Sequence, residues 1–209
     1  MKYIDDPLRK YFDEAASASE TPGGGSIAGV CGALAAAMMS MVCNFTIGRK
    51  KYAAVEPEAR ELLAAAGSRM EEMLRLAVAD TEGFDVIAKA YALPKETEAD
   101  KAARSTAIEA GCRAAMDAPA RIFDGTLAIL RTLRRLVEIG NRNLISDVGV
   151  SAIMARAAAE AAAMNVMINL KAIKDEPFTS ARRAALDAGL READAIEREV
   201  KAKVWAAVR

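Results

Sequence analysis

Residues 27–47 contain no charged side chain, and this run constrains the fold more than any other feature of the sequence. The turn-forming segment TPGGGS precedes it at residues 21–26, and Gly48 and the basic residues 49–51 follow it. Alanine and methionine favour helix, and small residues spaced four apart let the backbone of another helix approach closely. Such small residues stand at Gly25, Gly29, Ala33 and Ala37. We therefore expect a buried central helix over residues 25–47.

This run is also long enough to cross a membrane, which takes about 20 apolar residues. Glycine, alanine, serine and asparagine dilute its hydrophobicity, and the sequence has no second run of this kind. A helix that is apolar on all sides also suits the buried centre of a bundle. We expect this second arrangement and no membrane partner.

Three consecutive glycines, Gly23, Gly24 and Gly25, stand at the start of this helix. Glycine costs backbone entropy, so the triplet needs a structural reason. One reason is a tight loop whose N–H groups meet an anionic or polar ligand at a helix start. The other is a flexible turn before a core helix. The triplet is not a P-loop, because the Gly-Lys-Ser/Thr ending is absent.

The overall composition excludes several kinds of site. Lysine plus arginine and aspartate plus glutamate both total 29, so no charge excess favours nucleic acid or an anionic membrane. The three cysteines lack CxxC spacing, which argues against a disulfide scaffold and a zinc site. Residues 1–12 contain no apolar leader segment, so we expect a cytoplasmic protein. Histidine is absent, so acid–base chemistry must use Asp, Glu, Lys, Tyr, Cys or water.

Almost every segment has a helical pattern, and no strand alternation is present. We expect one all-α domain over residues 1–209, a bundle of long antiparallel helices without a sheet. The first helix would use Asp5 or Asp6 as its cap, and the fourth would be kinked or interrupted at Pro119. A loop is expected at residues 140–143, and Pro177 would separate the last two helices. The expected helices are 5–19, 25–47, 56–93, 97–139, 145–173 and 179–207.

One carboxylate interrupts the apolar stripe of the helix expected over residues 56–93. The missing position of that stripe is occupied by Asp80, and a carboxylate there costs free energy unless it is paired, protonated or functional. The alternative is a local break in which residues 80–83 form a cap and a turn. The stripe itself consists of Met70, Met73, Ala77, Phe84, Ile87 and Tyr91.

Three more polar residues lie on one face of the helix expected over residues 145–173. Asp147 and Asn165 are eighteen residues, or five helical turns, apart, and Asn169 lies four residues further on. The surface around them is otherwise apolar, which favours a binding role. Asp147 can instead be a helix cap, as can Ser146, and the two asparagines can form a hydrogen-bonded pair in the core.

The basic residues Arg49, Lys50 and Lys51 also have two interpretations. Cations are favoured at the C-terminus of a helix, which is a purely structural reason for them. Alternatively, they bind carboxylates of a substrate or supply a lysine to the chemistry.

Several of these segments together resemble one known family. They are TPGGGS, TIGRKKY at residues 46–52, DTEGF at 80–84, YALPK at 91–95, GNRNLISDVGV at 140–150 and NVMINLKAIKDEPF at 165–178. In this order they resemble the formiminotransferase-cyclodeaminase/cyclohydrolase family over about residues 8–185. The resemblance implies a helical, dimeric protein that acts on a tetrahydrofolate derivative as its substrate and uses no separate cofactor or metal.

The resemblance also implies roles for particular residues. The family's catalytic aspartate lies in an Asp-x-(Asp/Glu)-x-Phe motif, which corresponds here to Asp80–Phe84, with Gly83 where alanine is expected. Asp80 would therefore be the base. The other roles are assigned by their chemistry alone: Lys50 would orient the water or polarise the developing oxygen. Arg49 or Lys51 would meet the glutamate tail, and Asp147 or the two asparagines would bind the pterin. The expected substrate-binding residues are Gly23, Gly24, Gly25, Ser26, Asn44, Arg49, Lys51, Asn141, Asp147, Asn165 and Asn169.

The expected reaction is hydrolysis of 5,10-methenyltetrahydrofolate to 10-formyltetrahydrofolate. A cyclodeaminase that acts on formiminotetrahydrofolate and releases ammonia would share the fold and the site. It needs a substrate made by a separate transferase, and the helical domain is expected to use all 209 residues, which favours the cyclohydrolase. A helical scaffold without enzymatic activity is the lesser alternative, and it leaves Asp80 and Asn165 unexplained.

Overall fold

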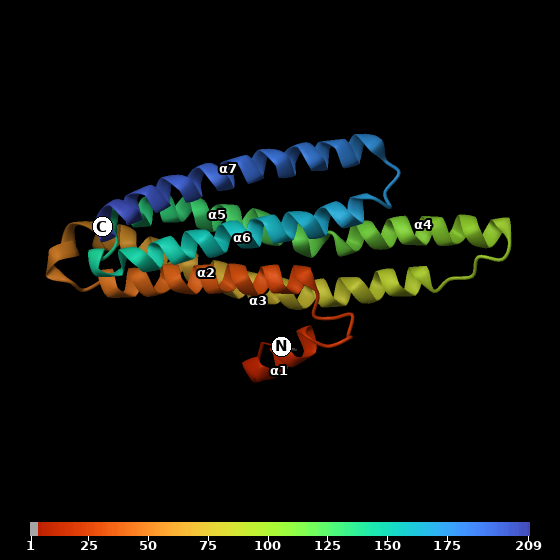
Figure 1. Ribbon diagram of the computed structural model, residues 1–209, viewed down its shortest axis with the longest axis horizontal. Helices are drawn as coiled ribbons and strands as arrows, with labels where there is room; N and C mark the ends of the chain where they lie inside the picture. The colour runs from red at the N-terminus through yellow and green to blue at the C-terminus, as the bar shows by residue number, and fades with distance from the viewer. Residues whose placement is uncertain (1–3) are drawn as a thin grey trace.

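The computed structural model describes residues 4–209, and within that range it contains helices and no strand (Figure 1). The expected all-α bundle is therefore confirmed. Residues 1–3, which belong to the start where no leader segment was expected, lie outside the described range. The elements are α1 (Leu8–Ala15), α2 (Gly24–Thr46), η1 (Lys50–Val55), α3 (Glu56–Tyr91), α4 (Glu98–Ala115), α5 (Asp117–Ile139), η2 (Arg142–Leu144), α6 (Ile145–Leu170) and α7 (Glu176–Val208).

The central helix is α2, as the uncharged run predicts. It packs against α3, α5 and α6, while α7 covers α5 and α6 from the other side (Figure 1). The C-terminal part of α3 and the antiparallel helix α4 extend together beyond the end of α2 (Figure 1). Helix α1 stands off the bundle below α2 and α3 (Figure 1), and its apolar residues Leu8 and Phe12 are exposed.

Small residues let the neighbours of α2 approach closely. A Cβ atom placed on Gly29 would lie 2.8 Å from the Cβ atom of Ala77 on α3, a contact that only glycine permits. Within residues 4–209, α2 is also the one helix whose length and hydropathy suit a membrane span. More than half of that apolar window is buried against other helices, which is equally typical of a core helix.

The third helix is continuous through Asp80, so the cap-and-turn alternative for residues 80–83 is wrong. Gly83 lies inside this helix and does not interrupt it. A Cβ atom on Gly83 would lie 3.2 Å from the Cα atom of Ala115, so its small size lets α3 and α4 approach each other beside Asp80.

The helix boundaries differ from expectation at three places. The helix expected over residues 97–139 is interrupted at Met116, and Pro119 lies in the first turn of α5, where its missing N–H costs least. Helix α1 is shorter than expected and has Pro7 rather than Asp5 or Asp6 at its N-cap. Pro177 lies in the first turn of α7 and does not precede it, because Asp175 is the N-cap.

Candidate active site

A cleft of about 600 Å³ lies where the N-terminus of α2, the middle of α3 and the C-terminal end of α6 meet. Five of the residues expected in the site line it: Gly23, Gly24, Asp80, Asn165 and Asn169. They come from three helices that are distant in sequence, so the fold brings together the motif residues at this end of α2.

Asp80 is held directly against the glycine triplet. A Cβ atom on Gly25 would lie 2.1 Å from Oδ1 of Asp80, so no other residue fits there without displacing the carboxylate. The backbone N–H of Ser26 donates a hydrogen bond to this carboxylate. The triplet thus forms the N-cap and first turn of α2, and the helix start faces the Asp80 carboxylate rather than forming a flexible turn. Binding of an external ligand by these N–H groups stays a prediction.

Burial raises the pKa of Asp80 above its ordinary value, and the Ser26 N–H bond offsets only part of this rise. Desolvation disfavours the charged form of a carboxyl group, which explains the direction of the shift. A half-buried carboxylate with a raised pKa in an open cleft is suited to taking and returning a proton.

The two asparagines each bond back to their own helix. Nδ2 of Asn165 donates to the carbonyl oxygen of Ala161 at 2.8 Å, and Nδ2 of Asn169 donates to that of Asn165 at 2.9 Å. The two asparagines are therefore hydrogen-bonded to each other, as the alternative interpretation expected, but through the Asn165 backbone carbonyl and at half-buried positions on the cleft rather than in the core. With the amide nitrogens used in this way, each side-chain oxygen remains as an acceptor at the cleft.

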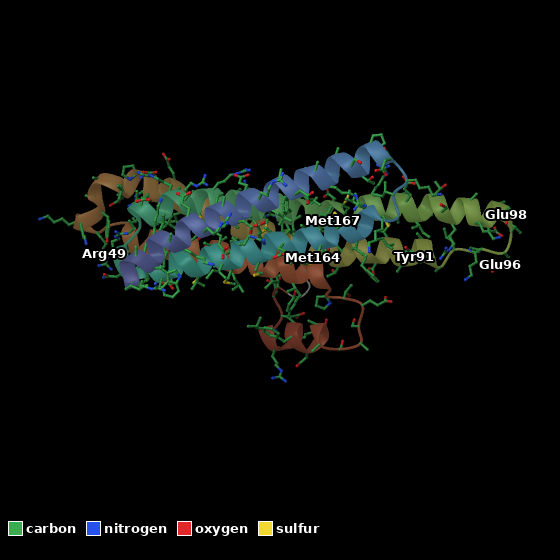
Figure 2. The ribbon with its side chains drawn as sticks, turned by 45° about the horizontal axis from the view of Figure 1, so that its top comes forward. Arg49, Tyr91, Glu96, Glu98, Met164 and Met167 are labelled. Carbon is green, nitrogen blue, oxygen red and sulfur yellow. The ribbon has the colours of Figure 1, made fainter. Side chains whose placement is uncertain are left out.

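The rest of the cleft wall was expected to be core. Phe84, Ile87 and Tyr91 continue the α3 stripe, but they line the cleft, and the Tyr91 side chain is 52% exposed. They form an apolar wall, with Tyr91 visible on the long α3–α4 extension (Figure 2). The helical periodicity identified the apolar stripe. It did not show that α2 stops before the C-terminal part of the stripe and so leaves that part uncovered.

Sequence reasoning missed Lys171 and Glu20, which line the same cleft. Lys171 is exposed and follows the C-terminus of α6, and no ion pair to it is found within residues 4–209. Its position two residues after Asn169, at the end of an uncharged stretch, was an available signal for a cation at the cleft.

The other expected site residues lie at the opposite end of α2. Arg49, Lys51 and Asn141 line a second pocket of about 480 Å³, together with Phe45, Tyr52, Asn143 and Leu144. Asn44, Lys50 and Asp147 belong to the same end, on α2, η1 and the first turn of α6. The 23 residues of α2 separate the two groups by about 35 Å. Figure 2 shows Arg49 at one end of the bundle and Tyr91 far from it.

This separation corrects two expectations for a single chain. Lys50 is too far from Asp80 of its own chain to act on a water there, and Arg49 and Lys51 are too far from that cleft to bind the tail of a ligand in it. Asp147 shares a face of α6 with Asn165 but lies at the other end of the helix. Its interpretation as a helix cap is also wrong, as is that of Ser146, because the N-cap of α6 is Leu144.

Comparison with known proteins identifies the family. The sequence model described as formiminotransferase-cyclodeaminase matches residues 7–188, which is most of the chain. The chain belongs to the formiminotransferase-cyclodeaminase family. This family was the one indicated by the sequence motifs, so that resemblance is confirmed.

Relatives within the formiminotransferase-cyclodeaminase family differ in length. The chain is 36% identical over 203 residues to the methenyltetrahydrofolate cyclohydrolase of Methylorubrum extorquens, and the match covers 94% of both chains. It is 33% identical to the formimidoyltransferase-cyclodeaminase of Sus scrofa, of which it spans only 35%. A solved structure described as formiminotetrahydrofolate cyclodeaminase from Thermotoga maritima superposes with a TM-score of 0.89, at 30% identity and 98% coverage of each chain.

For a member of this family, the cleft contains the groups that acid–base chemistry on a flat, polar ring system requires. One carboxylate with a raised pKa lies between carboxamide acceptors and an apolar wall. Within residues 4–209, no three His, Cys, Asp or Glu side chains gather as they would to hold a metal ion. That the enzyme uses no cofactor besides its folate substrate remains a prediction.

Proposed function

We propose that this protein hydrolyses 5,10-methenyltetrahydrofolate to 10-formyltetrahydrofolate. The observation that carries the proposal is the 36% identity to a methenyltetrahydrofolate cyclohydrolase over 94% of both chains. The cleft supports it independently, because Asp80 provides a carboxylate where a cationic substrate must be attacked by water.

The proposed chemistry uses Asp80 twice. The substrate has an amidinium-like cation that bridges N5 and N10, and the ionised Asp80 stabilises this charge. Asp80 takes one proton from water as its oxygen bonds to the bridging carbon, which gives a neutral carbinolamine. The protonated Asp80 then donates to N5, the C–N5 bond breaks, and the hydroxyl proton leaves to solvent as the formyl group forms. One water is consumed and one proton is released.

The raised pKa of Asp80 suits both steps. A carboxyl group with its ordinary pKa is a weak base and holds a proton poorly near neutral pH. Burial raises the pKa of Asp80 and so brings it closer to the working pH. The Ser26 N–H bond fixes the orientation of the carboxylate without removing that shift.

The surrounding residues have positioning roles in this proposal. The apolar wall of Phe84, Ile87 and Tyr91 packs against the pterin, and the side-chain oxygens of Asn165 and Asn169 accept from its amino and N–H groups. Lys171 provides a positive charge at the cleft for the carboxylates of the substrate's tail.

Formiminotetrahydrofolate cyclodeaminase activity is the second candidate, because the superposed Thermotoga maritima structure has that description. Two assays on the purified protein separate the candidates. One follows loss of methenyltetrahydrofolate absorbance above the spontaneous rate, and the other follows ammonia released from formiminotetrahydrofolate. We expect fast turnover in the first and little in the second. The reverse result would replace the proposed reaction with the deaminase.

We also propose a homodimer that forms through the outer face of α2 and α6. On this dimer face, exposed apolar side chains follow both helices. Its positions on α2 carry no charge, whereas on α6 the exposed Glu160 lies in the same row and pairs with Arg156. A length of about 35 Å and the width of two helices about 10 Å apart give roughly 700 Å². A stable interface buries about 800 Å² per partner, so the dimer face has the required size. Its exposed residues are Ile27, Leu34, Phe45, Val150, Ile153, Met164 and Ile168.

The cytoplasm is the proposed location. All three cysteines are free thiols, and two of them are buried. Free thiols are typical of proteins in reducing compartments.

A further inference from the structure

The second pocket, at the C-terminal end of α2, is lined by cationic side chains that form no ion pair among the described residues. We call it the basic pocket; it is the 480 Å³ pocket lined by Arg49, Lys51 and Asn141. Asn141 fixes its shape, since its backbone N–H donates to Thr46 Oγ1 at 2.9 Å and its Nδ2 donates to the Phe45 carbonyl oxygen at 2.8 Å.

The two cations that line this pocket, Arg49 and Lys51, and the adjacent Lys50 have no carboxylate partner among the described residues of their own chain. Within residues 4–209, no ion pair forms with Arg49, Lys50 or Lys51. The carboxylate closest in sequence, Glu56, is occupied by Arg60 and by the N–H of Gly48. Three adjacent positive charges therefore remain available to an anionic group from elsewhere.

Both pockets open at the edge of the dimer face. Phe45 belongs to the dimer face and lines the basic pocket, while Ile168 belongs to the dimer face and lines the Asp80 cleft. A partner that covers this face must therefore border both pockets, one at each end.

A twofold axis in the interface permits two orientations of the partner. An axis parallel to the helices places each basic pocket beside the partner's basic pocket, where six unpaired cations repel one another. An axis across the helices makes α2 antiparallel to its copy and places each basic pocket beside the partner's Asp80 cleft. That cleft contains the carboxylates of Asp80 and Glu20 and only one cation, Lys171, so charge complementarity favours the second orientation.

We infer that the Asp80 cleft is completed by the segment 49–52 of a second copy of this chain. The partner's cations would then bind the carboxylate tail of the substrate together with Lys171, while Asp80 of the first copy acts on its ring. This inference rests on the proposed function and on the proposed dimer. It also gives Arg49, Lys50 and Lys51 the substrate-binding roles expected from the sequence. Within one chain they cannot have these roles, because about 35 Å separates them from the Asp80 cleft.

Mixed dimers of two inactive variants test the inference. One chain carries Asp80→Asn, and the other carries Arg49→Ala, Lys50→Ala and Lys51→Ala together. They are co-expressed with different affinity tags and purified through both. With a shared site, the mixed dimer has one intact site and should show about half of the wild-type kcat/KM per dimer. If each site belongs to one chain, the mixed dimer should show no more than half of the value of the triple variant alone, and the inference is wrong.

Cross-linking gives a second readout that does not depend on activity. In a Cys31→Ala, Cys112→Ala background, which also removes the free thiol that lines the Asp80 cleft, Lys50→Cys and Tyr91→Cys are introduced together and treated with a bismaleimide that spans about 10 Å. The two positions are too far apart for a link within one chain, so a shared site predicts covalent dimers, which neither single variant should form. Covalent dimers with an inactive wild type would overturn only the proposed function. An active, dimeric wild type without cross-link and without restored turnover would overturn the inference alone.

Discussion

At the scale of single residues, the site depends on one carboxylate and on the missing side chain opposite it. Gly25 leaves room for Asp80 and Gly24 leaves room for Asn165, whose Nδ2 would lie 3.1 Å from an added Cβ atom. The start of α2 therefore provides both space and a hydrogen-bond donor, from Ser26, at one point. Because these constraints act on the same carboxylate, substitutions of Asp80 and of Gly25 should have related effects.

Replacement of Asp80 by asparagine should remove the proton transfer and keep the shape. An amide oxygen still accepts from the Ser26 N–H, but an amide is not a base at neutral pH. We expect turnover of methenyltetrahydrofolate to fall at least about a hundredfold, the lower end of general acid–base effects, with an unchanged circular dichroism spectrum. Near-normal turnover would show that Asp80 is not the catalytic base.

The same variant should change the pH dependence of stability. The folded-state pKa of Asp80 is raised, so the folded protein binds this proton more tightly than the unfolded chain does. The wild type therefore loses stability as the pH rises from the ordinary aspartate pKa, about 3.9, through the raised value. Asparagine does not titrate, so the variant should gain stability relative to wild type as the pH rises. Urea unfolding of both proteins from acid to neutral pH measures this difference, and a flat difference would contradict it.

Gly25→Ala should displace the catalytic carboxylate directly. The added methyl group would lie 2.1 Å from Asp80 Oδ1, so the side chain must rotate away from the Ser26 N–H. We expect turnover to fall about a hundredfold and the free energy of unfolding to fall by about 1–3 kcal/mol. Gly67→Ala is the matched control, because no atom lies within 4 Å of its Cβ position in α3. It should leave turnover unchanged and stabilise by roughly 0.5–1 kcal/mol, whereas a loss of turnover in both variants would point to a general effect of alanine.

At the scale of helices, the sequence predicted most of the fold, because uncharged and periodic runs identify helices directly. The uncharged run predicted α2 to within one residue at each end, and the stripe in α3 located Asp80 as an exception. The break at Met116 was expected only as a disturbance near Pro119, since nothing in the residues fixes where two helices separate. Which residues share a site depends on tertiary packing. Helical spacing therefore placed Asp147 and Asn165 in one site, although they lie at opposite ends of α6.

Helix α4 offers a test of local stability away from the site. Thr97 is its N-cap and forms a capping box with Asp100, at the end of the α3–α4 extension where Glu98 is labelled in Figure 2. Thr97→Ala removes the cap bond and should lower the free energy of unfolding by about 1 kcal/mol without affecting turnover.

The control for this helix is Thr106→Ala, an exposed position in its interior. Its hydroxyl only donates back to the Ala102 carbonyl oxygen, and alanine has the higher helix propensity. We expect it to be neutral or slightly stabilising in urea unfolding. Equal losses in the two variants would mean that the capping box contributes nothing specific.

At the scale of the whole molecule, each end of the chain carries a different part of the proposed shared site. The acidic cleft and the basic pocket lie at opposite ends of α2, and an apolar dimer face about 35 Å long joins them. In the proposed dimer, a central helix without charges would serve two purposes: its inner side fills the core, and its outer side would contact the partner. Such a double use would account for the membrane-like composition of α2.

The dimer face gives the last prediction, which concerns Leu34 near the middle of α2. This side chain is 51% exposed, so Leu34→Glu leaves a solvated carboxylate in a free chain and should preserve the helical spectrum. In the dimer, both copies would bury an unpaired charge at several kcal/mol each, so dissociation should be at least about a thousandfold easier. Light scattering at micromolar concentration should give about twice 22.2 kDa for the wild type and the monomer mass for the variant. Val86→Glu, an equally exposed apolar position on α3, should remain dimeric. A monomeric wild type that sediments with lipid vesicles would assign the face to a membrane, and a dimeric Leu34→Glu variant would place the interface elsewhere.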